Sequence, residues 1–454
     1  MLDPGFVPAA LWNRAYRLLV DSHKDAQPLG IALERGDATR SVFWTRILPH
    51  TGTNSALSRK YIERLLKFLL WQRGGYRVTI GGDPALAAMV REIYRPGGER
   101  AFDCEFMGEK VYGRPMIVES CAFDALPQPR ESSIPLGRNL EGCRIGFDLG
   151  GSDRKCAALI GGKVVFSEEV AWDPYFESDP QYHLDGINDS LQRAAARLPR
   201  VDAIGGSAAG VYVNNEVRVA SLFRGVSKEN FEQRVRGIFL ELKKKWAGIP
   251  FEVVNDGEVT ALAGSLSMGD NAVLGVSMGT SQASGYVDPH GHILPWLNEL
   301  AFAPIDYRED APIDEWSGDK GCGVQYFSQQ GVARLIPAAG ISVPAGMPLA
   351  QQLQEVQRLM EKGDVRARRI YETIGVYFGY AVAHYAEFYE VRNLLILGRV
   401  TSGEGGEIIL KRAASVLRNE FPELGECIQL RTPSEQDKRH GQAIAAASLP
   451  KLGS

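Results

Sequence analysis

The stretch that decides the fold of this chain is Ile145-Gly146-Phe147-Asp148-Leu149-Gly150-Gly151-Ser152. The largely apolar residues 143–149 and the strand-like residues 156–166 predict the two arms of a β-hairpin, with the glycine pair at its turn. Glycine lets a backbone approach a polyphosphate without a Cβ clash, and a nearby Asp can hold Mg²⁺ or its water shell. The stretch therefore predicts a phosphate-handling turn, although Asp-x-Gly-Gly is also found in ordinary hairpins.

Four further segments share one pattern, an apolar strand that ends in a loop of small or polar residues. They are residues 201–210, residues 251–257 with Asn255 and Asp256 in the loop, residues 272–281 with Gly279, Thr280 and Ser281, and residues 394–398 with Gly398. A helix of small residues is predicted directly after the second segment, over residues 258–266.

In this order the motifs resemble those of the ROK family of sugar kinases, within the superfamily of actin, hexokinase and heat-shock ATPases. The resemblance runs from about residue 143 to the C-terminus, roughly two-thirds of the chain. It implies an α/β fold of two actin-like (ribonuclease H-like) lobes around a nucleotide cleft. Residues 141–258 with 435–454 are expected to form the first lobe, and residues 259–434 the second.

Composition agrees with a globular protein of two or three domains, because 44% of the 454 residues are hydrophobic. The net charge of -4 provides no basic footprint for nucleic acid or an anionic membrane. Six cysteines form no C-x-x-C pair, which favours reduced thiols. No signal peptide or membrane-spanning run is recognised, so we expect a soluble, cytoplasmic protein.

Residues 1–140 lie outside the resemblance and predict an N-terminal mixed α/β domain of unknown role. Its predicted elements are a hairpin over 31–48, an amphipathic helix over 58–72, a strand over 76–81, a helix over 84–94 and a hairpin over 102–122. A proline-bearing linker follows over 125–140.

Some ROK proteins are repressors with an N-terminal winged helix, which residues 11–20 and 58–60 could imitate. The region is only about +4 in charge and rich in predicted strands, so we expect no nucleic-acid partner. Three roles stay open for the domain. It could cover the cleft, mediate oligomerisation such as a homodimer, or be a diverged copy of a kinase lobe.

The resemblance implies ATP-dependent phosphoryl transfer to a hydroxyl of a sugar or sugar-like substrate, with Mg²⁺ and ATP as cofactors. Asp256 matches the catalytic Asp of the family and follows a strand, where open α/β sheets collect ligands, so it is the expected general base. Asn255 can donate to and accept from a sugar hydroxyl. The alternative is that Asn-Asp-Gly is a turn that caps the next helix.

On the nucleotide side, Asp148 is expected to orient Mg²⁺ through water. The residues that the resemblance places against the nucleotide and its phosphates are Gly150, Gly151, Ser152, Gly279, Thr280, Ser281 and Gly398. The chain departs from the family here, since the loop that begins at Gly279 is poorer in glycine and Arg399 follows Gly398.

On the acceptor side, the family's Glu-x-Gly-His element maps onto residues 299–302, which keep the carboxylate as Glu299 and replace His by Phe302. The Gly-Cys-Leu-Glu element maps onto residues 321–324, where a second sugar-binding Glu becomes Val324. The His and two of three zinc cysteines of the family are absent, so no zinc site is expected. Losing a bidentate carboxylate disfavours glucose and leaves phosphorylated, acetylated or deoxy sugars and other polyols open.

Two alternatives retain the ROK fold without sugar phosphorylation: a non-catalytic, sugar-sensing regulator, or an ATPase that couples lobe closure to a partner. Retention of Asp148, Asp256 and Thr280 favours the kinase, whereas the altered glycine loops favour the alternatives. Sugar-dependent release of ADP separates them.

Overall fold

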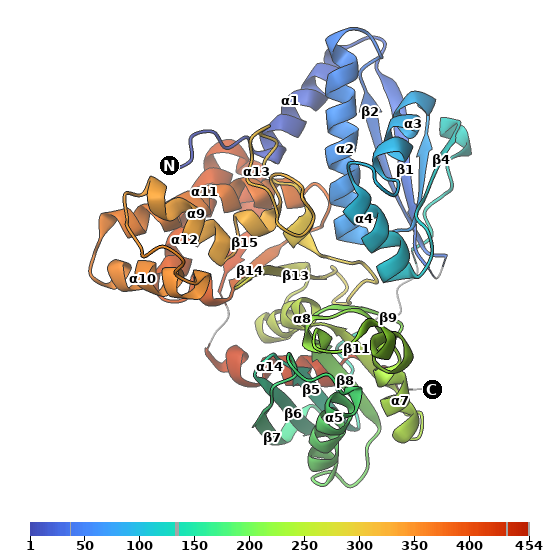
Figure 1. The fold of residues 1–454 in the computed structure, drawn as a ribbon, viewed down its shortest axis with the longest axis vertical. Helices are drawn as coiled ribbons and strands as arrows, with labels where there is room; N and C mark the ends of the chain where they lie inside the picture. The colour runs from blue at the N-terminus through green and yellow to red at the C-terminus, as the bar shows by residue number, and fades with distance from the viewer. Residues whose placement is uncertain (37, 132–135, 433–434, 453–454) are drawn as a thin grey trace.

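The computed structural model describes residues 1–36, 38–131, 136–432 and 435–452. These residues form an α/β protein of two lobes and an N-terminal region, each built on its own sheet. Figure 1 shows the N-terminal region at the upper right, the helices of the second lobe at the left and the first lobe below. None of the described helices is long and apolar enough to cross a membrane.

The first lobe contains a five-stranded sheet in the order β11-β8-β5-β6-β7. Strands β5, β6 and β7 form an antiparallel meander, and β8 and β11 continue the sheet parallel to β5. This is the strand order of a ribonuclease H-like lobe, as the resemblance implied. Its elements are β5 (Cys143–Leu149), β6 (Asp153–Ile160), β7 (Lys163–Ala171), α5 (Pro180–Ala195), β8 (Ala203–Ala208), β9 (Val211–Val213), β10 (Glu216–Val219), α6 (Lys228–Asn230), α7 (Ile238–Lys245) and β11 (Phe251–Asn255).

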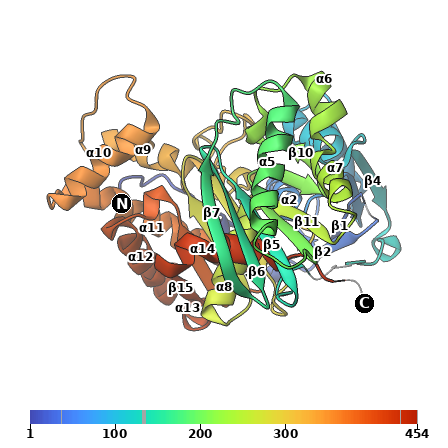
Figure 2. The ribbon, with the colours of Figure 1, turned by 90° about the horizontal axis from the view of Figure 1, so that it is seen from below.

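Helix α14 (Glu435–Ala447) packs on this sheet although it comes from the other end of the chain. Figure 2 shows it beside β5 and β6. A Cβ on Gly146 would lie 1.8 Å from the Ala443 carbonyl oxygen, and one on Gly205 would lie 1.7 Å from that of Ala446. Glycine at these two strand positions therefore lets the helix backbone rest directly on the sheet.

The second lobe has a four-stranded sheet in the order β13-β12-β14-β15, with β13 antiparallel to β12 and the other pairs parallel. Helix α8 links the two lobes, because it starts directly after β11 and packs against β12 and β13. The elements are α8 (Asp256–Met268), β12 (Val273–Met278), β13 (Gln282–Val287), α9 (Gln329–Ala338), α10 (Leu349–Glu361), α11 (Val365–Tyr385), β14 (Asn393–Leu397), α12 (Glu404–Glu420), α13 (Pro422–Cys427) and β15 (Gln429–Arg431).

The N-terminal sheet has the order β2-β1-β3-β4. The predicted first hairpin, long helix, strand and helix are confirmed as β1 with β2, α2, β3 and α3. Helix α3 begins as its sequence dictates, with Pro84 at its start and the Asp83 carboxylate accepting from the Leu86 N–H at 2.9 Å. The elements are α1 (Ala9–Ser22), β1 (Gln27–Glu34), β2 (Arg40–Ile47), α2 (Thr53–Arg73), β3 (Arg77–Gly81), α3 (Pro84–Ile93), α4 (Ala101–Glu105) and β4 (Ile117–Cys121).

The hairpin predicted over residues 102–122 is wrong. Helix α4 and a π-helical segment (Phe106–Tyr112) come first, and β4 then pairs parallel with β3. Phe102 and Phe106 lie four residues apart and both pack near Trp71, as expected of residues on one helical face. Gly108, predicted to form the turn, instead lies where a Cβ would meet the Met116 backbone nitrogen at 2.7 Å.

The N-terminal sheet is not a copy of a kinase-lobe sheet. Its central pair, β1 with β3, is antiparallel, whereas the corresponding pair in the first lobe, β5 with β8, is parallel. Helices α1 and α2 are separated by the β1–β2 hairpin rather than by the short turn of a helix-turn-helix.

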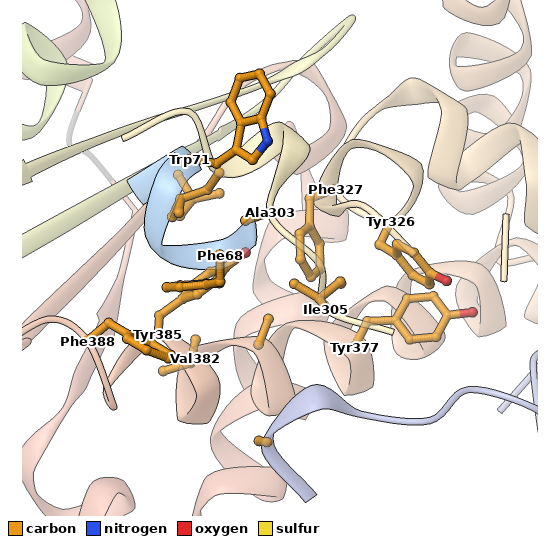
Figure 3. Packing of buried hydrophobic residues seen from close by; sticks show 14 of the residues in the cluster. Phe68, Trp71, Ala303, Ile305, Tyr326, Phe327, Tyr377, Val382, Tyr385 and Phe388 are labelled. Atoms are coloured by element: carbon orange, nitrogen blue, oxygen red, sulfur yellow. The ribbon is translucent and has the colours of Figure 1, made fainter. Parts of the chain in front are cut away.

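Helix α2 joins the N-terminal region to the second lobe through one continuous hydrophobic core. Its Phe68 packs 4.2 Å (ring centroids) from Phe388, and its Trp71 packs 4.3 Å from Phe302. Figure 3 shows Phe68 and Trp71 among side chains from the second lobe. The first lobe has a separate core around Phe147. Helix α2 is therefore buried on several sides, and not only along the one apolar face that its sequence predicted.

A buried cluster of ions reinforces the same junction. The Asp319 carboxylate pairs with Lys67 at 3.2 Å, Arg64 at 3.1 Å and Arg100 at 2.5 Å. Burial alone would raise the pKa of Asp319, but these three cations hold it well below its usual range. The cluster ties α2 to the segment that leads to Cys322.

Candidate active site

The carboxylate of Asp148 lies near the end of β5. Ser207, its register partner on β8, donates a hydrogen bond of 2.6 Å to it. Burial raises the pKa of Asp148, and the Ser207 bond opposes that effect. One carboxylate oxygen accepts this bond, which leaves the other for a metal-bound water, so the group fits the predicted Mg²⁺ role.

The predicted phosphate turn forms between β5 and β6. The Gly150 N–H donates to the Asp153 carbonyl at 2.9 Å, which closes the turn. The Gly150 carbonyl accepts from the Trp172 indole at 2.8 Å, and the Ser152 hydroxyl donates to the Asp153 carboxylate at 2.9 Å. The turn is thus held by its own neighbours and by an aromatic side chain that sequence reasoning missed.

Gly151 shows why the second glycine is required. A Cβ there would lie 2.1 Å from the Tyr175 hydroxyl, so only glycine allows this ring to cover the turn. The Arg224 guanidinium in turn lies 3.9 Å above the Tyr175 ring. No local motif marked Tyr175 or Arg224, because they follow the turn at a distance in sequence.

Asp256 is the first residue of α8, directly after β11, and its side chain is half-buried. Burial, and then the charge of Asp148, raise its pKa to about 6. A carboxylate with a pKa close to neutral is well matched to general-base work. The structure therefore brings Asp148 and Asp256 within electrostatic range of each other, as the motif order predicted.

Asn255, the residue before Asp256, has a structural role. Its side-chain oxygen accepts from the Gly257 N–H at 2.7 Å, which caps α8, and its amide donates to the Gly210 carbonyl at 2.7 Å. The capping alternative thus describes Asn255 correctly. Its predicted role as a substrate ligand stays a prediction.

Glu299, the predicted acceptor ligand, precedes a short 3-10 turn (Leu300–Phe302) in the second lobe. Burial, and then the charge of Asp256, raise its pKa to about 7, so it also lies near the proposed base. Its backbone N–H donates to the Trp71 carbonyl at 2.9 Å, and the N–H of Asn298 donates to the Gln72 carbonyl at 2.8 Å. The last turn of α2, whose carbonyls have no partner within the helix, therefore positions Glu299.

A further carboxyl group, Glu258, was missed by sequence reasoning. It is buried and accepts from the Asn298 side chain at 2.5 Å and from the Tyr286 N–H at 3.0 Å. Burial, and then the charge of Glu299, raise its pKa to about 8. Among the described residues, neither Lys nor Arg forms an ion pair with Asp256, Glu258 or Glu299.

The second predicted phosphate loop connects β12 and β13. The Gly279 N–H donates to the Ser281 carbonyl at 2.9 Å, while the Gly279 carbonyl accepts from the Gln329 N–H at 2.9 Å. Thr280 and Ser281 are exposed at the tip. Gly398 has a φ of 98°, and a Cβ there would lie 2.5 Å from the Met278 carbonyl oxygen, so the turn that was predicted for the adenosine side lies against the start of this loop.

The two positions at which the resemblance predicted a loss of polar acceptor contacts pack together. Phe302 and Val324 belong to one small apolar cluster with Ala301 and Cys322. Burial raises the pKa of the Cys322 thiol to about 12. Within the described residues, no group of three His, Cys, Asp or Glu side chains could hold a metal ion.

Comparison with known proteins finds similarity only at the level of structure. No family model and no curated protein sequence matches the chain. A ROK hexokinase from Thermus thermophilus is 19% identical, with a TM-score of 0.54 over 68% of this chain and 97% of its own. A ROK transcriptional regulator, a homologue of the E. coli MLC protein, is 20% identical, with a TM-score of 0.52 over 68% and 79%.

A further neighbour is a putative N-acetylmannosamine kinase from Listeria monocytogenes, 14% identical, with a TM-score of 0.51 over 67% of this chain and 97% of its own. At these identities the comparison shows the fold alone. The chain has the two-lobed fold of ROK sugar kinases, as the motif order predicted, and that fold is shared by enzymes and by a regulator.

Proposed function

We propose that this protein is an ATP-dependent kinase that phosphorylates a hydroxyl of a sugar or sugar-like molecule, with Asp256 as the general base. The observation that carries the proposal is the position and pKa of Asp256. Its carboxylate follows β11 in a ROK-type fold, stands beside Asp148 and Glu299, and has a pKa of about 6.

The remaining roles are those that the resemblance to the family's motifs implies. The acceptor hydroxyl would donate its proton to Asp256 as the bond to phosphorus forms. Glu299 would hold a neighbouring hydroxyl, since a charge-assisted hydrogen bond orients it. Asp148 would hold Mg²⁺ through water, and bound Mg-ATP would supply the phosphoryl group and neutralise its charge. Gly150, Gly151, Ser152, Gly279, Thr280, Ser281 and Gly398 would face the nucleotide.

The kinase is favoured over a sensor or a partner-coupled ATPase by the uncompensated carboxyl groups. Keeping several carboxyl groups close together without a cation is unfavourable for a structural role, because each raises the pKa of the next. Carboxyl groups held together with raised pKa values are typical of a site that binds hydroxyl donors and moves a proton. Similarity to a ROK regulator supports the sensor as the second candidate.

A coupled assay of ADP release by the purified protein with Mg-ATP tests the proposal. The panel contains sugars, amino sugars and polyols. ADP release that depends on one class of acceptor supports the kinase. Release without any acceptor supports an ATPase, and saturable sugar binding without release supports a sensor. Asp364→Asn, at the N-cap of α11, controls for losing an aspartate outside the predicted site.

A further inference from the structure

A cavity of about 230 Å³ lies where the N-terminal region meets the two lobes. The π-helical segment with Val111 and Tyr112 contributes to one wall, β9 and the turn after it to a second, and residues 293–297 to a third. Two of the residues that line it, Asn255 and Glu258, flank Asp256 in sequence. The cavity therefore adjoins the acceptor side of the site.

Tyr212 gives independent support for this position. It lines the cavity, and burial, followed by the charge of Asp256, raises the pKa of its hydroxyl. The phenol donates to the Ala209 carbonyl at 3.0 Å, so the ring is held in place. A group that entered the cavity would thus lie within electrostatic range of the proposed base.

The walls of the cavity are mainly apolar. Aliphatic side chains line all three walls, and the aromatic ones are Tyr112, Tyr212 and Trp296. The indole nitrogen of Trp296 is buried and has no hydrogen-bond partner among the described residues. This lining resembles a small-molecule pocket, in which a few polar groups stand among apolar walls.

The polar groups around the cavity disfavour an anion. Arg35 is the cation in its lining, and its charge is already compensated by Glu131 at 2.5 Å, with a further bond to the Ser41 hydroxyl at 2.7 Å. Glu252 and Glu258 add carboxyl groups to the lining. A phosphate or carboxylate placed there would find no uncompensated cation among the residues that line the cavity.

We propose that this cavity receives an uncharged, apolar substituent of the acceptor, an aryl or short alkyl group, while the reactive hydroxyl lies at Asp256. The inference rests on the proposed kinase function. A volume of about 230 Å³ is below the roughly 300–1,000 Å³ of pockets that enclose a whole drug-sized ligand, so part of the acceptor fits and the rest occupies the cleft. The replacement of polar acceptor contacts by Phe302 and Val324 agrees with a less polar acceptor.

Calorimetric titration of the full chain with glucose, phenyl β-glucoside, butyl β-glucoside and glucose 6-phosphate tests the proposal. Burial of the added apolar surface is expected to make both glucosides bind about tenfold or more tightly than glucose, and the phosphate to bind more weakly. The two glucosides separate an aryl preference from an alkyl preference. Equal affinity for all four, or preference for the phosphate, would overturn the inference.

Val213→Phe fills the cavity from β9, and Val219→Phe places the same ring on the neighbouring strand β10, outside the lining. The tighter binding of the two glucosides relative to glucose should disappear in Val213→Phe and persist in Val219→Phe. Val213→Leu is the milder replacement if the first variant does not fold. An advantage that persists in the filled cavity contradicts the proposal.

ADP release in the same samples separates this inference from the kinase itself. If glucose is phosphorylated but the glucosides bind no more tightly than glucose, the assignment of the cavity is overturned and the proposed kinase function stands. Tight glucoside binding that Val213→Phe abolishes, with no ADP release for any acceptor, keeps the cavity and overturns the kinase.

Discussion

The proposed phosphate side and the proposed acceptor side of the cleft are built in different ways. On the phosphate side, Gly150 bonds to Asp153 and Gly279 bonds to Ser281, so each loop is closed by residues next to it in the chain. On the acceptor side, Glu299 is held by the Trp71 carbonyl of α2, from the distant N-terminal region. The bonds that close the two turns are local in sequence, although Trp172 and Gln329 also bond to them, whereas the position of Glu299 depends on the N-terminal region.

The difference gives the N-terminal region a structural role that its sequence did not show. Helix α2 packs Trp71 against Phe302, holds Glu299 by its last turn, and ties the segment before Cys322 to itself through Asp319. The acceptor side should therefore respond to changes in α2, whereas the phosphate turns should not. The predictions below test this contrast, beginning with the largest expected effect.

Asp256→Asn should abolish phosphoryl transfer and leave nucleotide binding nearly intact. The amide is close in shape but cannot take the hydroxyl proton, and general-base catalysis is worth about 10²–10⁴-fold. Steady-state turnover and ATP titration of the same sample measure the two effects. Turnover equal to that of the unmodified protein would remove Asp256 from the mechanism.

Asp319→Asn should destabilise the fold by about 3–5 kcal/mol, because it leaves Lys67, Arg64 and Arg100 buried without their shared partner. Asp310→Asn is the matched control, since Asp310 is exposed and pairs only at the surface. Denaturant unfolding gives both values. If the two variants unfold alike, the ion cluster does not hold the acceptor side to α2.

Glu299→Gln should weaken acceptor binding by about 1.5–3 kcal/mol, the value of a hydrogen bond to a charged group, with little effect on ATP affinity. Titration with acceptor and with ATP separates the two sides of the cleft. Efficient phosphorylation of glucose that this substitution leaves unchanged would mean that other residues build the acceptor site.

Glu258→Gln should flatten the pH dependence of stability. The pKa of Glu258 is raised to about 8 from an ordinary value of 4.5, so the folded state binds more protons than the unfolded state between those values. Its contribution to stability is complete below about pH 4.5 and is lost as the pH rises towards 8. Unfolding at pH 5 and pH 8 should differ less in the variant, and an unchanged difference would contradict the raised pKa.

Treatment with a chelator should have no effect on thermal stability. Of the zinc ligands that the resemblance implies for residues 290–322, only Cys322 is present in this chain. Elemental analysis together with melting curves, with and without EDTA, checks this. One zinc ion per chain would show that the segment was misaligned with the family.

The loops of the site were predictable because strand and turn signals are local. An apolar run followed by glycine or Asn-Asp marks the end of a strand wherever the strand packs, so the turns around Gly150, Asp256, Gly279 and Gly398 are found where the motifs place them. The segment 102–122 was mispredicted because Gly108 is a turn signal in the sequence, whereas in the structure it lies inside the π-helical segment, where the close Met116 backbone requires glycine.

The sequence by itself determined the motif order, the two-lobed fold that this order implies, and Asp256 as the candidate base. Only the tertiary structure decided that Glu258 lies next to Glu299, that Tyr175 covers Gly151, and that α2 positions the acceptor side. The physical reason is how far apart in the sequence the interacting groups lie. Backbone turns are fixed by neighbouring residues, whereas burial, pKa and enclosure depend on groups that folding brings from distant parts of the chain.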